Sequence, residues 1–322
     1  MFNLEIKELR IGNIVLPSNV LMAPLASYTC YPFRIMCSEL GAGLCFTEMV
    51  NCNALRYQDK ETRKLLFTTE KEKIKAAQLI GSDPRIIEKM AISDYLQEFD
   101  IIDINMGCPV PNVFKSGQGS ALLADLKKSS EIIKGCKKSG KVVTVKFRVG
   151  ILEDKMIAAE FAKVCEDSGA DMITVHGRSR NMMYYGDPYF DQIEEAKSVV
   201  KIPVIANGGV FSAEDAKKMM DLTGADGVMI ARYAIENPFI FSELTHKEIK
   251  KSKYTFLIEQ VDLTAKYYDE TFTIAYIKKI AAYWVRAQKE TRQYKDELYK
   301  CGNIEELKYT IKKIFDEGKR LD

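Results

Sequence analysis

The segment from Ile101 to Pro109 carries the residue of this chain best suited to chemistry. It reads Ile-Ile-Asp-Ile-Asn-Met-Gly-Cys-Pro, and its alternating apolar start is typical of a buried strand. Gly107 and Pro109 then favour a turn that leads the chain out of the sheet. Cys108 would thus stand on a rigid element and face an opening, which suits a reactive thiol. The alternative is a buried packing residue, the usual place of a free cysteine.

Polar residues near the ends of other strand-like runs could hold a phosphorylated, electron-rich aromatic cofactor. The two glycines after Asn207 and the guanidinium of Arg232 would bind its phosphate through N–H groups and a charge-assisted contact. Gln78 offers one amide donor and one acceptor to the edge of a planar ring. Lys146 could stabilise negative charge at a flavin N1–C2 carbonyl, and His176 could donate to or orient a ring edge. These chemical types together point to flavin mononucleotide (FMN).

Each of these side chains also has a structural interpretation. Lys146 could simply pair with Asp103, and His176 could be a core histidine with satisfied hydrogen bonds. The convergence of five or more such residues on one rim favours a binding site. The candidate FMN-binding residues are Pro24, Leu25, Ala26, Gln78, Lys146, His176, Asn207, Gly208, Gly209, Ala231 and Arg232.

Eight apolar, β-branched runs, whose starts lie 24 to 41 residues apart, alternate with helix-like segments. This alternation predicts an α/β fold, a closed (β/α)8 TIM barrel, in which catalytic groups stand at the carboxyl ends of the strands. A doubly wound sheet is the alternative, but no Gly-x-Gly-x-x-Gly follows the first run. Ser212 and Asp215 predict a helix start, and Gly169 and Gly224 predict helix ends. The predicted strands are Val20–Ala23, Leu44–Val50, Ala76–Gly81, Ile101–Gly107, Val142–Phe147, Met172–His176, Ile202–Ala206 and Gly227–Ile230.

The pattern changes in the last quarter of the chain, where strand-like runs end and helical periodicity covers Phe272–Gln288 and Ile304–Phe315. We therefore predict a catalytic barrel at residues 1–245 and a small all-helical domain at 246–322. The second part holds 17 Lys and Arg against 13 Asp and Glu, a net charge of +4, which leaves −2 for the rest of the chain. A modestly basic domain could bind a polyanion, although a solvated helical surface would look the same.

Composition excludes several other classes of protein. The 322 residues are 47% hydrophobic and 29% charged, as in ordinary globular proteins. Because no apolar stretch approaches the roughly 20 residues of a membrane helix and the first residues do not resemble a signal peptide, we expect a cytoplasmic protein. Eight cysteines without a Cys-x-x-Cys pair, beside two histidines, indicate free thiols and no metal site. Trp284 and the tyrosines near it are interpreted as packing residues.

Five motifs in the predicted barrel resemble, in order and spacing, those of the tRNA-dihydrouridine synthase family. The likeness covers the barrel almost end to end and continues through Gly117–Leu123. Residues 41–49 are similar to the bacterial branch of the family, and residues 278–286 weakly resemble its helical RNA-binding domain. The five motifs are Met22–Ala26, Gln78–Pro84, Asp103–Pro109, His176–Arg180 and Ile205–Gly209.

This resemblance implies an FMN enzyme that reduces a uridine in the D-loop of tRNA to 5,6-dihydrouridine, with NADPH or NADH as reductant. A hydride would pass from flavin N5 to C6 of a uracil extruded from its stack, and Cys108 would supply the proton at C5. The resemblance implies tRNA as partner, with neither a membrane nor an obligatory protein partner. The candidate substrate-binding residues are Asn105, Arg148, Arg178, Lys278 and Arg286.

Two positions depart from the family pattern, and two other functions remain as alternatives. Asn112 stands where relatives usually have Lys, with Lys115 nearby, and Ile280 stands where they often have His. The first departure concerns one substrate contact and the second the docking of RNA. An FMN barrel that acts on a free pyrimidine, similar to dihydroorotate dehydrogenase, is disfavoured by the Gly-Cys-Pro turn and the helical appendage. A non-catalytic RNA-binding barrel is disfavoured by the intact set of polar residues.

Overall fold

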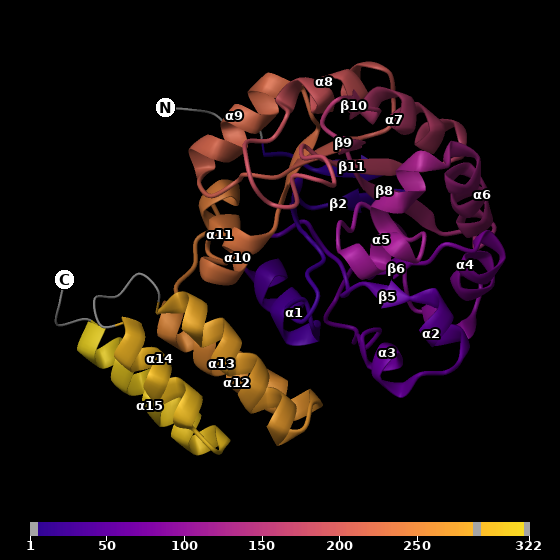
Figure 1. The fold of residues 1–322 in the computed structure, drawn as a ribbon. Coiled ribbons are helices and arrows are strands. Elements are labelled where there is room, and N and C mark those ends of the chain that lie inside the picture. The colour runs from indigo at the N-terminus through magenta and orange to yellow at the C-terminus, as the bar shows by residue number, and fades with distance from the viewer. Residues whose placement is uncertain (1–5, 286–290, 319–322) are drawn as a thin grey trace.

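In the computed structural model, which describes residues 6–285 and 291–318, eight parallel strand positions form a barrel with helices around it (Figure 1). The strands are β3 (Val20–Met22), β4 (Leu44–Cys45), β5 (Val50–Asn51), β6 (Ala76–Ile80), β7 (Ile101–Met106), β8 (Val142–Arg148), β11 (Met172–His176), β12 (Val204–Asn207) and β13 (Gly227–Ile230). Their hydrogen-bonded order is β4-β3-β13-β12-β11-β8-β7-β6-β5. The two ends of this sheet, β4 and β5, follow each other in the chain, and Thr47 N–H donates to the Ala76 carbonyl at 3.0 Å between them. Residues 44–51 thus fill one strand position and close the predicted (β/α)8 barrel.

All eight predicted strands are present, but two need correction and four others end one residue earlier or later than predicted. Met172–His176 and Gly227–Ile230 are right to the residue. The single strand predicted at Leu44–Val50 is wrong in detail, because the chain between β4 and β5 makes one isolated bridge, from Phe46 to Ala76, and no ladder. The strand predicted to begin at Ile202 begins instead at Val204, after a proline that has no N–H to donate to a ladder.

Helices follow the strands along the chain and form the outer layer. Ser212 Oγ accepts the N–H of Asp215 at 3.1 Å, so the predicted helix start there is confirmed. Gly224 ends that helix with φ +62°, and Gly169 follows another with φ +95°, so both predicted ends are confirmed. The barrel helices are α1 (Tyr31–Glu39), α2 (Cys52–Arg56), α3 (Lys60–Lys64), α4 (Pro84–Ala91), α5 (Pro111–Lys115), α6 (Leu126–Lys137), α7 (Ala158–Asp167), α8 (Phe190–Ser198), α9 (Ala213–Thr223), α10 (Arg232–Glu236) and α11 (Ile240–Thr245).

A hairpin that the sequence analysis did not predict closes the amino-terminal end of the barrel. Its strands, β1 (Leu9–Ile11) and β2 (Ile14–Leu16), pair antiparallel. Leu9, Ile11 and Leu16 are buried in one apolar cluster with residues at the starts of the barrel strands, such as Ile101 and Met172. This end of the barrel interior is therefore filled with apolar side chains, which leaves the carboxyl end for polar residues. A second short hairpin, β9 (Gly150–Leu152) with β10 (Lys155–Met156), follows β8.

The last part of the chain is helical, as predicted, and lies beside α1 and α10 (Figure 1). Three of the side-chain hydrogen bonds that join it to the barrel come from Gln260, Tyr276 and Trp284. Gln260 Nε2 donates to the Pro32 carbonyl, the Tyr276 hydroxyl to the Tyr28 carbonyl, and Trp284 Nε1 to the Ile235 carbonyl, at 2.8 to 2.9 Å. Trp284 is thus a packing residue, as interpreted from the sequence. The helices are α12 (Lys253–Tyr267), α13 (Glu270–Trp284), α14 (Thr291–Lys300) and α15 (Ile304–Gly318).

Two of these four helices were predicted, and α12 and α14 were not. The helix predicted at Phe272–Gln288 begins two residues earlier, behind the cap of Asp269, and its last three positions lie outside the described residues. The domain boundary near residue 245 stays a prediction. Within the described part of the chain, no helix has both the length and the apolar character needed to cross a membrane.

Candidate active site

Polar side chains gather inside the carboxyl end of the barrel because strand residues alternate between two faces. On β8, Val142 belongs to the apolar cluster inside the barrel, so Lys146, four residues later, points to the same side. Parallel register places Asn105 opposite Lys146, and His176 opposite Asn207. The sequence therefore brings candidate residues from neighbouring strands to one level, above the apolar filling.

A chain of hydrogen bonds starts at Asp103, a buried carboxyl group on β7. It accepts from Thr144 Oγ1 and from Gln78 Nε2, both at 2.6 Å. Burial raises the pKa of Asp103, while these two bonds and the charge of Lys146 oppose the rise. Because the nitrogen of the Gln78 amide faces Asp103, its oxygen faces Asn105, whose Nδ2 donates to it at 2.9 Å.

The same series of hydrogen bonds ends at the turn that carries the candidate thiol. With its nitrogen turned to Gln78, Asn105 presents Oδ1 to the N–H groups of Gly107 and Cys108, at 3.1 and 2.9 Å. The buried carboxyl group thus sets the orientation of two amides and, through them, the position of the Cys108 backbone. Asp103 and Thr144 were not predicted from the sequence as supports of the site. Asp103 could have been, because it lies two residues before Asn105 on the same strand and so points to the same side.

This series of hydrogen bonds leads to a prediction about Asn105. Asn105→Asp keeps the acceptor for the Cys108 N–H but replaces the donor to Gln78 with a carboxylate oxygen. We expect this mismatch to lower the free energy of unfolding by about 1–3 kcal/mol and to change the alkylation rate of Cys108. Denaturant unfolding and thiol labelling measure the two effects. Asn112→Asp, the same change at an exposed position of α5, is the control; equal effects of the two variants would contradict the role given to Asn105.

Cys108 is the half-buried member of a set of eight free cysteines, of which the other seven are buried. Its carbonyl accepts from the N–H and the hydroxyl of Ser120, at 3.1 and 2.9 Å. Gly119 makes this approach possible: its φ is +60°, and a Cβ there would lie 2.8 Å from Cys108 Cβ. Burial raises the pKa of the Cys108 thiol, so it holds its proton at neutral pH. A protonated, reachable thiol can act as a general acid.

Lys146 contacts Asn207 rather than the acid with which the sequence suggested it could pair. Its Nζ donates to Asn207 Oδ1 at 2.8 Å, and Asn207 Nδ2 donates to the Met229 carbonyl at 2.8 Å. Burial, with the charge of Arg148, lowers the pKa of Lys146 from 10.5 to about 7, and the charge of Asp103 opposes this. The ammonium is thus held where a bound anion or an electron-rich ring would favour its charged form.

A cationic corner lies next to Lys146, at the ends of β11, β12 and β13. His176, Arg178, Gly208 and Arg232 line one hollow there. Burial and the nearby arginines lower the pKa of His176 well below its usual value, so the ring is neutral. Gly208 has φ +114°, and a Cβ there would lie 2.8 Å from the His176 ring. Two cations, a neutral imidazole and bare backbone form a donor set that fits a phosphate group.

These features match a known family. The family model of dihydrouridine synthase (Dus) covers residues 21–319 of the chain. The tRNA-dihydrouridine synthase B of Vibrio cholerae is 38% identical over 239 residues, 74% of each protein. A probable tRNA-dihydrouridine synthase of Rickettsia prowazekii is 35% identical over 265 residues, 81% of each. The chain belongs to the dihydrouridine synthase family. The predictions of this family and of its flavin-dependent oxidoreductase class are thereby confirmed.

Similar solved structures support the barrel fold. An NCR variant from Zymomonas mobilis has a TM-score of 0.54 and 16% identity, over 77% of this chain and 94% of that one. Histamine dehydrogenase from Rhizobium sp. 4-9 has a TM-score of 0.58 and 13% identity. That match covers 80% of this chain and half of the longer dehydrogenase. At such identities the likeness concerns the fold alone.

Two candidate substrate-binding residues have contacts that tie together parts of this dihydrouridine synthase. The buried Arg148 guanidinium donates to the carbonyls of Gly107, Ser179 and Met183, at 2.7 to 2.9 Å. It therefore fastens the Cys108 turn to the loop after β11. Lys278 Nζ donates to the carbonyls of Tyr299 and Cys301, at 3.0 and 2.5 Å, and so joins α13 to the end of α14.

The other expectations from the family pattern have different outcomes. Arg178 Nε donates to the Gly186 carbonyl at 2.9 Å, while its Nη1 lies 3.4 Å from His176 Nε2. Arg286 lies outside the described residues. Ile280, which replaces a frequent His, is buried with 1% of its surface exposed, so this position serves packing in this chain. The roles in binding and catalysis assigned to these residues stay predictions.

Proposed function

We propose that this dihydrouridine synthase reduces a uridine of tRNA to 5,6-dihydrouridine, with FMN as cofactor and NADPH or NADH as reductant. The observation that carries the proposal is the meeting of a protonated thiol, a buried amine and a phosphate-type corner at one end of the barrel. The names of the similar bacterial proteins support tRNA as the substrate. The cytoplasm, where tRNA is found, is the location that we expect.

FMN, when bound, supplies the hydride for this reduction. The residues present fit it at both ends. Arg178, Gly208, Gly209 and Arg232 would hold its phosphate in the cationic corner. Lys146 would stabilise negative charge on the electron-rich part of the ring, and the Gln78 amide, oriented by Asp103, would meet a ring edge. Pro24, Leu25, Ala26 and Ala231, at the ends of β3 and β13, would complete the cradle through their backbone.

Cys108 would complete the reaction by proton transfer. Hydride addition at C6 of the uracil leaves an electron pair at C5, and the thiol proton forms the new C5–H bond as the S–H bond breaks. The Asn105 bonds to the backbone of the turn and the Arg148 contact hold the thiol in place. A base reaches this barrel mouth only when it leaves its stack, so the RNA must present an extruded uridine.

Arg232→Ala tests the phosphate assignment. Loss of a charge-assisted contact should weaken FMN binding by roughly 10- to 100-fold, which corresponds to about 1.5–3 kcal/mol. Quenching of flavin fluorescence on titration with the protein measures the affinity. Arg10→Ala is the matched control, because Arg10 is an exposed guanidinium at the opposite end of the barrel. A protein that takes up no FMN, or an equal loss in both variants, would remove the basis of the proposal.

A further inference from the structure

Ser27, in the loop that follows β3, has an unfavourable backbone conformation. Its φ is +67°, in the left-handed region that L-residues other than asparagine and aspartate rarely adopt. The residue is exposed, and it belongs to no helix or strand. Such a conformation persists only where the surrounding contacts impose it.

This loop reaches the candidate flavin site. Leu25, two residues before Ser27, lines the cationic corner together with Arg232. The Leu25 carbonyl accepts the N–H groups of Tyr28 and Thr29, both at 3.0 Å, and the Leu25 N–H donates to Thr29 Oγ1 at 3.1 Å. Because these bonds close the turn from residue 25 to residue 29, the backbone angles of Ser27 inside it help to determine where Leu25 lies.

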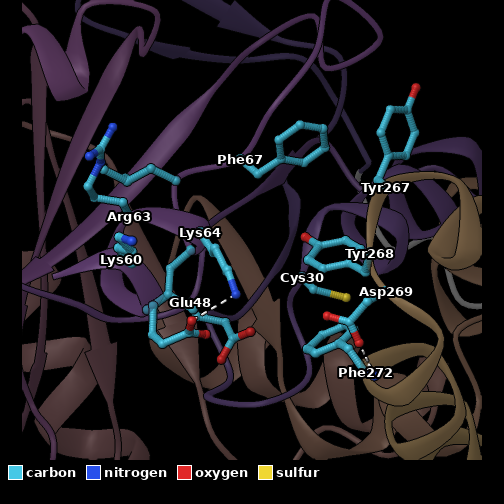
Figure 2. Close-up of a pocket in the computed structure, with 13 residues that line it drawn as sticks. Cys30, Glu48, Lys60, Arg63, Lys64, Phe67, Tyr267, Tyr268, Asp269 and Phe272 are labelled. Carbon is cyan, nitrogen blue, oxygen red and sulfur yellow. Dashed lines mark hydrogen bonds and ion pairs between the residues drawn. The ribbon is translucent and has the colours of Figure 1, made fainter.

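Glu48 holds the Ser27 backbone from the side of the barrel. Its half-buried carboxylate accepts the Ser27 N–H. Burial raises the pKa of Glu48, while the bond from Ser27 and the charge of Lys279 oppose this rise. Figure 2 shows Glu48 in the pocket between α3 and the turn that joins α12 to α13, where Lys64 pairs with Glu61 at 2.7 Å. The Glu48 carboxylate thus makes a charge-assisted hydrogen bond to the main chain of the loop.

Lys279, on α13, holds the same residue through its carbonyl. Lys279 Nζ donates to the Ser27 carbonyl at 3.3 Å and lies over the ring of Tyr28, 5.5 Å from its centroid. The hydroxyl of Tyr276, one turn earlier on α13, donates to the next carbonyl, that of Tyr28, at 2.8 Å. The two polar groups of the Ser27 backbone are therefore held by different parts of the chain, the N–H by the barrel and the carbonyl by the last helices.

We propose that Glu48 and Lys279 are positioning residues of the flavin site, which hold Ser27 in its left-handed conformation and so keep Leu25 at the cationic corner. Without these contacts the turn relaxes toward a conformation with negative φ, and Leu25 moves with it. The last helices, in which the sequence resembles an RNA-binding domain, then also contribute to FMN binding. The inference rests on FMN as the cofactor of the proposed function and adds two residues to its site.

Glu48→Ala removes the acceptor of the Ser27 N–H. The variant should bind FMN about 5- to 30-fold more weakly, the factor by which an ordinary L-residue disfavours the left-handed region. Glu48→Gln, whose amide oxygen still accepts the N–H, should lose less. Quenching of flavin fluorescence on titration with the flavin-free protein measures the affinity. Glu61→Ala, at a carboxylate of the same pocket that pairs with Lys64, is the matched control. Equal affinities of Glu48→Ala and the wild type would overturn the inference.

A second substitution shows whether Glu48 acts through the Ser27 backbone. Glycine adopts positive φ without steric cost, so the doubly substituted Ser27→Gly, Glu48→Ala protein should recover most of the FMN affinity that Glu48→Ala loses. Lost packing or a less stable fold would leave the double variant as weak as the single one, because Ser27→Gly removes only an exposed side chain. A double variant without any recovery would therefore contradict the positioning role.

Lys279→Met keeps the length of the side chain and removes the donor to the Ser27 carbonyl. This variant should weaken FMN binding by about 2- to 10-fold, the factor expected for the loss of one hydrogen bond. Lys266→Met, at an exposed lysine of α12, controls for the loss of a charge from the last helices. An FMN affinity equal to that of the wild type in Lys279→Met would exclude the helical part of the chain from the flavin site.

Hydrogen exchange of the flavin-free proteins measures the hold on the loop without a cofactor. Amides of the peptide from residue 24 to residue 30 should exchange faster in Glu48→Ala and in Lys279→Met than in the wild type, while those of β12 should not change. A wild type that binds FMN, beside a Glu48→Ala variant with the same affinity and the same exchange, would remove the inference and keep the proposed function. A wild type that takes up no FMN would remove both.

Discussion

Cys108→Ala should bind FMN and accept electrons from NADPH at the wild-type rate, yet form dihydrouridine roughly 10²- to 10⁴-fold more slowly, the usual contribution of a positioned general acid. The turn that carries the thiol is held by Asn105, Ser120 and Arg148 through backbone atoms. The substitution thus removes the proton source and leaves these backbone contacts in place.

Measuring the two half-reactions separately distinguishes a loss of proton transfer from a loss of flavin reduction. Bleaching of flavin absorbance by NADPH reports the first, and dihydrouridine formed in a single turnover from pre-reduced enzyme reports the second. Cys108→Ser, whose hydroxyl is a weaker acid than a thiol, should fall between alanine and the wild type. A normal second half-reaction in Cys108→Ala would make this cysteine a packing residue, the alternative that the sequence left open.

The sequence predicts the barrel well because its signals are local. Each strand is a short apolar, β-branched run, and two of the eight predicted ranges are right to the residue. The missed hairpin β1–β2 also had a local signal, since Gly12-Asn13 between short apolar segments is typical of a tight turn. The α12 helix had one as well, because the Ser252 side chain caps it by accepting the Thr255 N–H.

What the sequence could not predict depends on atoms that meet only in the folded chain. The role of Asp103 arises from the register of three strands, which places Gln78 on one side of it and Thr144 on the other. The pairing of Lys146 with Asn207 joins strands 61 residues apart in sequence. A pocket between α3 and the turn that joins α12 to α13 is more remote still, because its walls come from Cys30, residues 48–67 and residues 267–272.

Arg148 has a structural role that residue type alone does not predict. A guanidinium at the end of a barrel strand suggests a ligand contact, and the sequence analysis assigned Arg148 to the substrate. In the structure its Nε and Nη1 donate to three main-chain carbonyls, so it connects the Cys108 turn to the loop after β11. Its assignment to the substrate stays a prediction. No pattern in the sequence predicts these Arg148 contacts, because the loop after β11 comes close to the Cys108 turn only in the folded protein. Arg178 and Arg232 were also assigned to ligands because they are arginines at strand ends. Unlike Arg148, both line the hollow of the cationic corner.

Lys146→Met should stabilise the flavin-free protein, and the gain should depend on pH. In the folded chain the pKa of Lys146 is about 7, against 10.5 for an ordinary lysine. Between these values the unfolded chain binds a proton that the folded chain lacks, so the free energy of unfolding of the wild type rises with pH there. Below pH 7 both states are protonated, and the full cost of burying the charge remains.

The substitution removes this titration, so the difference between variant and wild type should be largest at pH 7 and below, and should shrink by on the order of 2 kcal/mol by pH 9. Denaturant unfolding of the flavin-free proteins at pH 7, 8 and 9 measures it. Lys89→Met, at an exposed lysine of α4, is the control for the loss of an amine outside the barrel. A difference that does not vary with pH would mean that Lys146 keeps an ordinary pKa. The expected result gives the buried amine a thermodynamic signature of a functional group, because the chain keeps at this strand end a charge that destabilises its own fold.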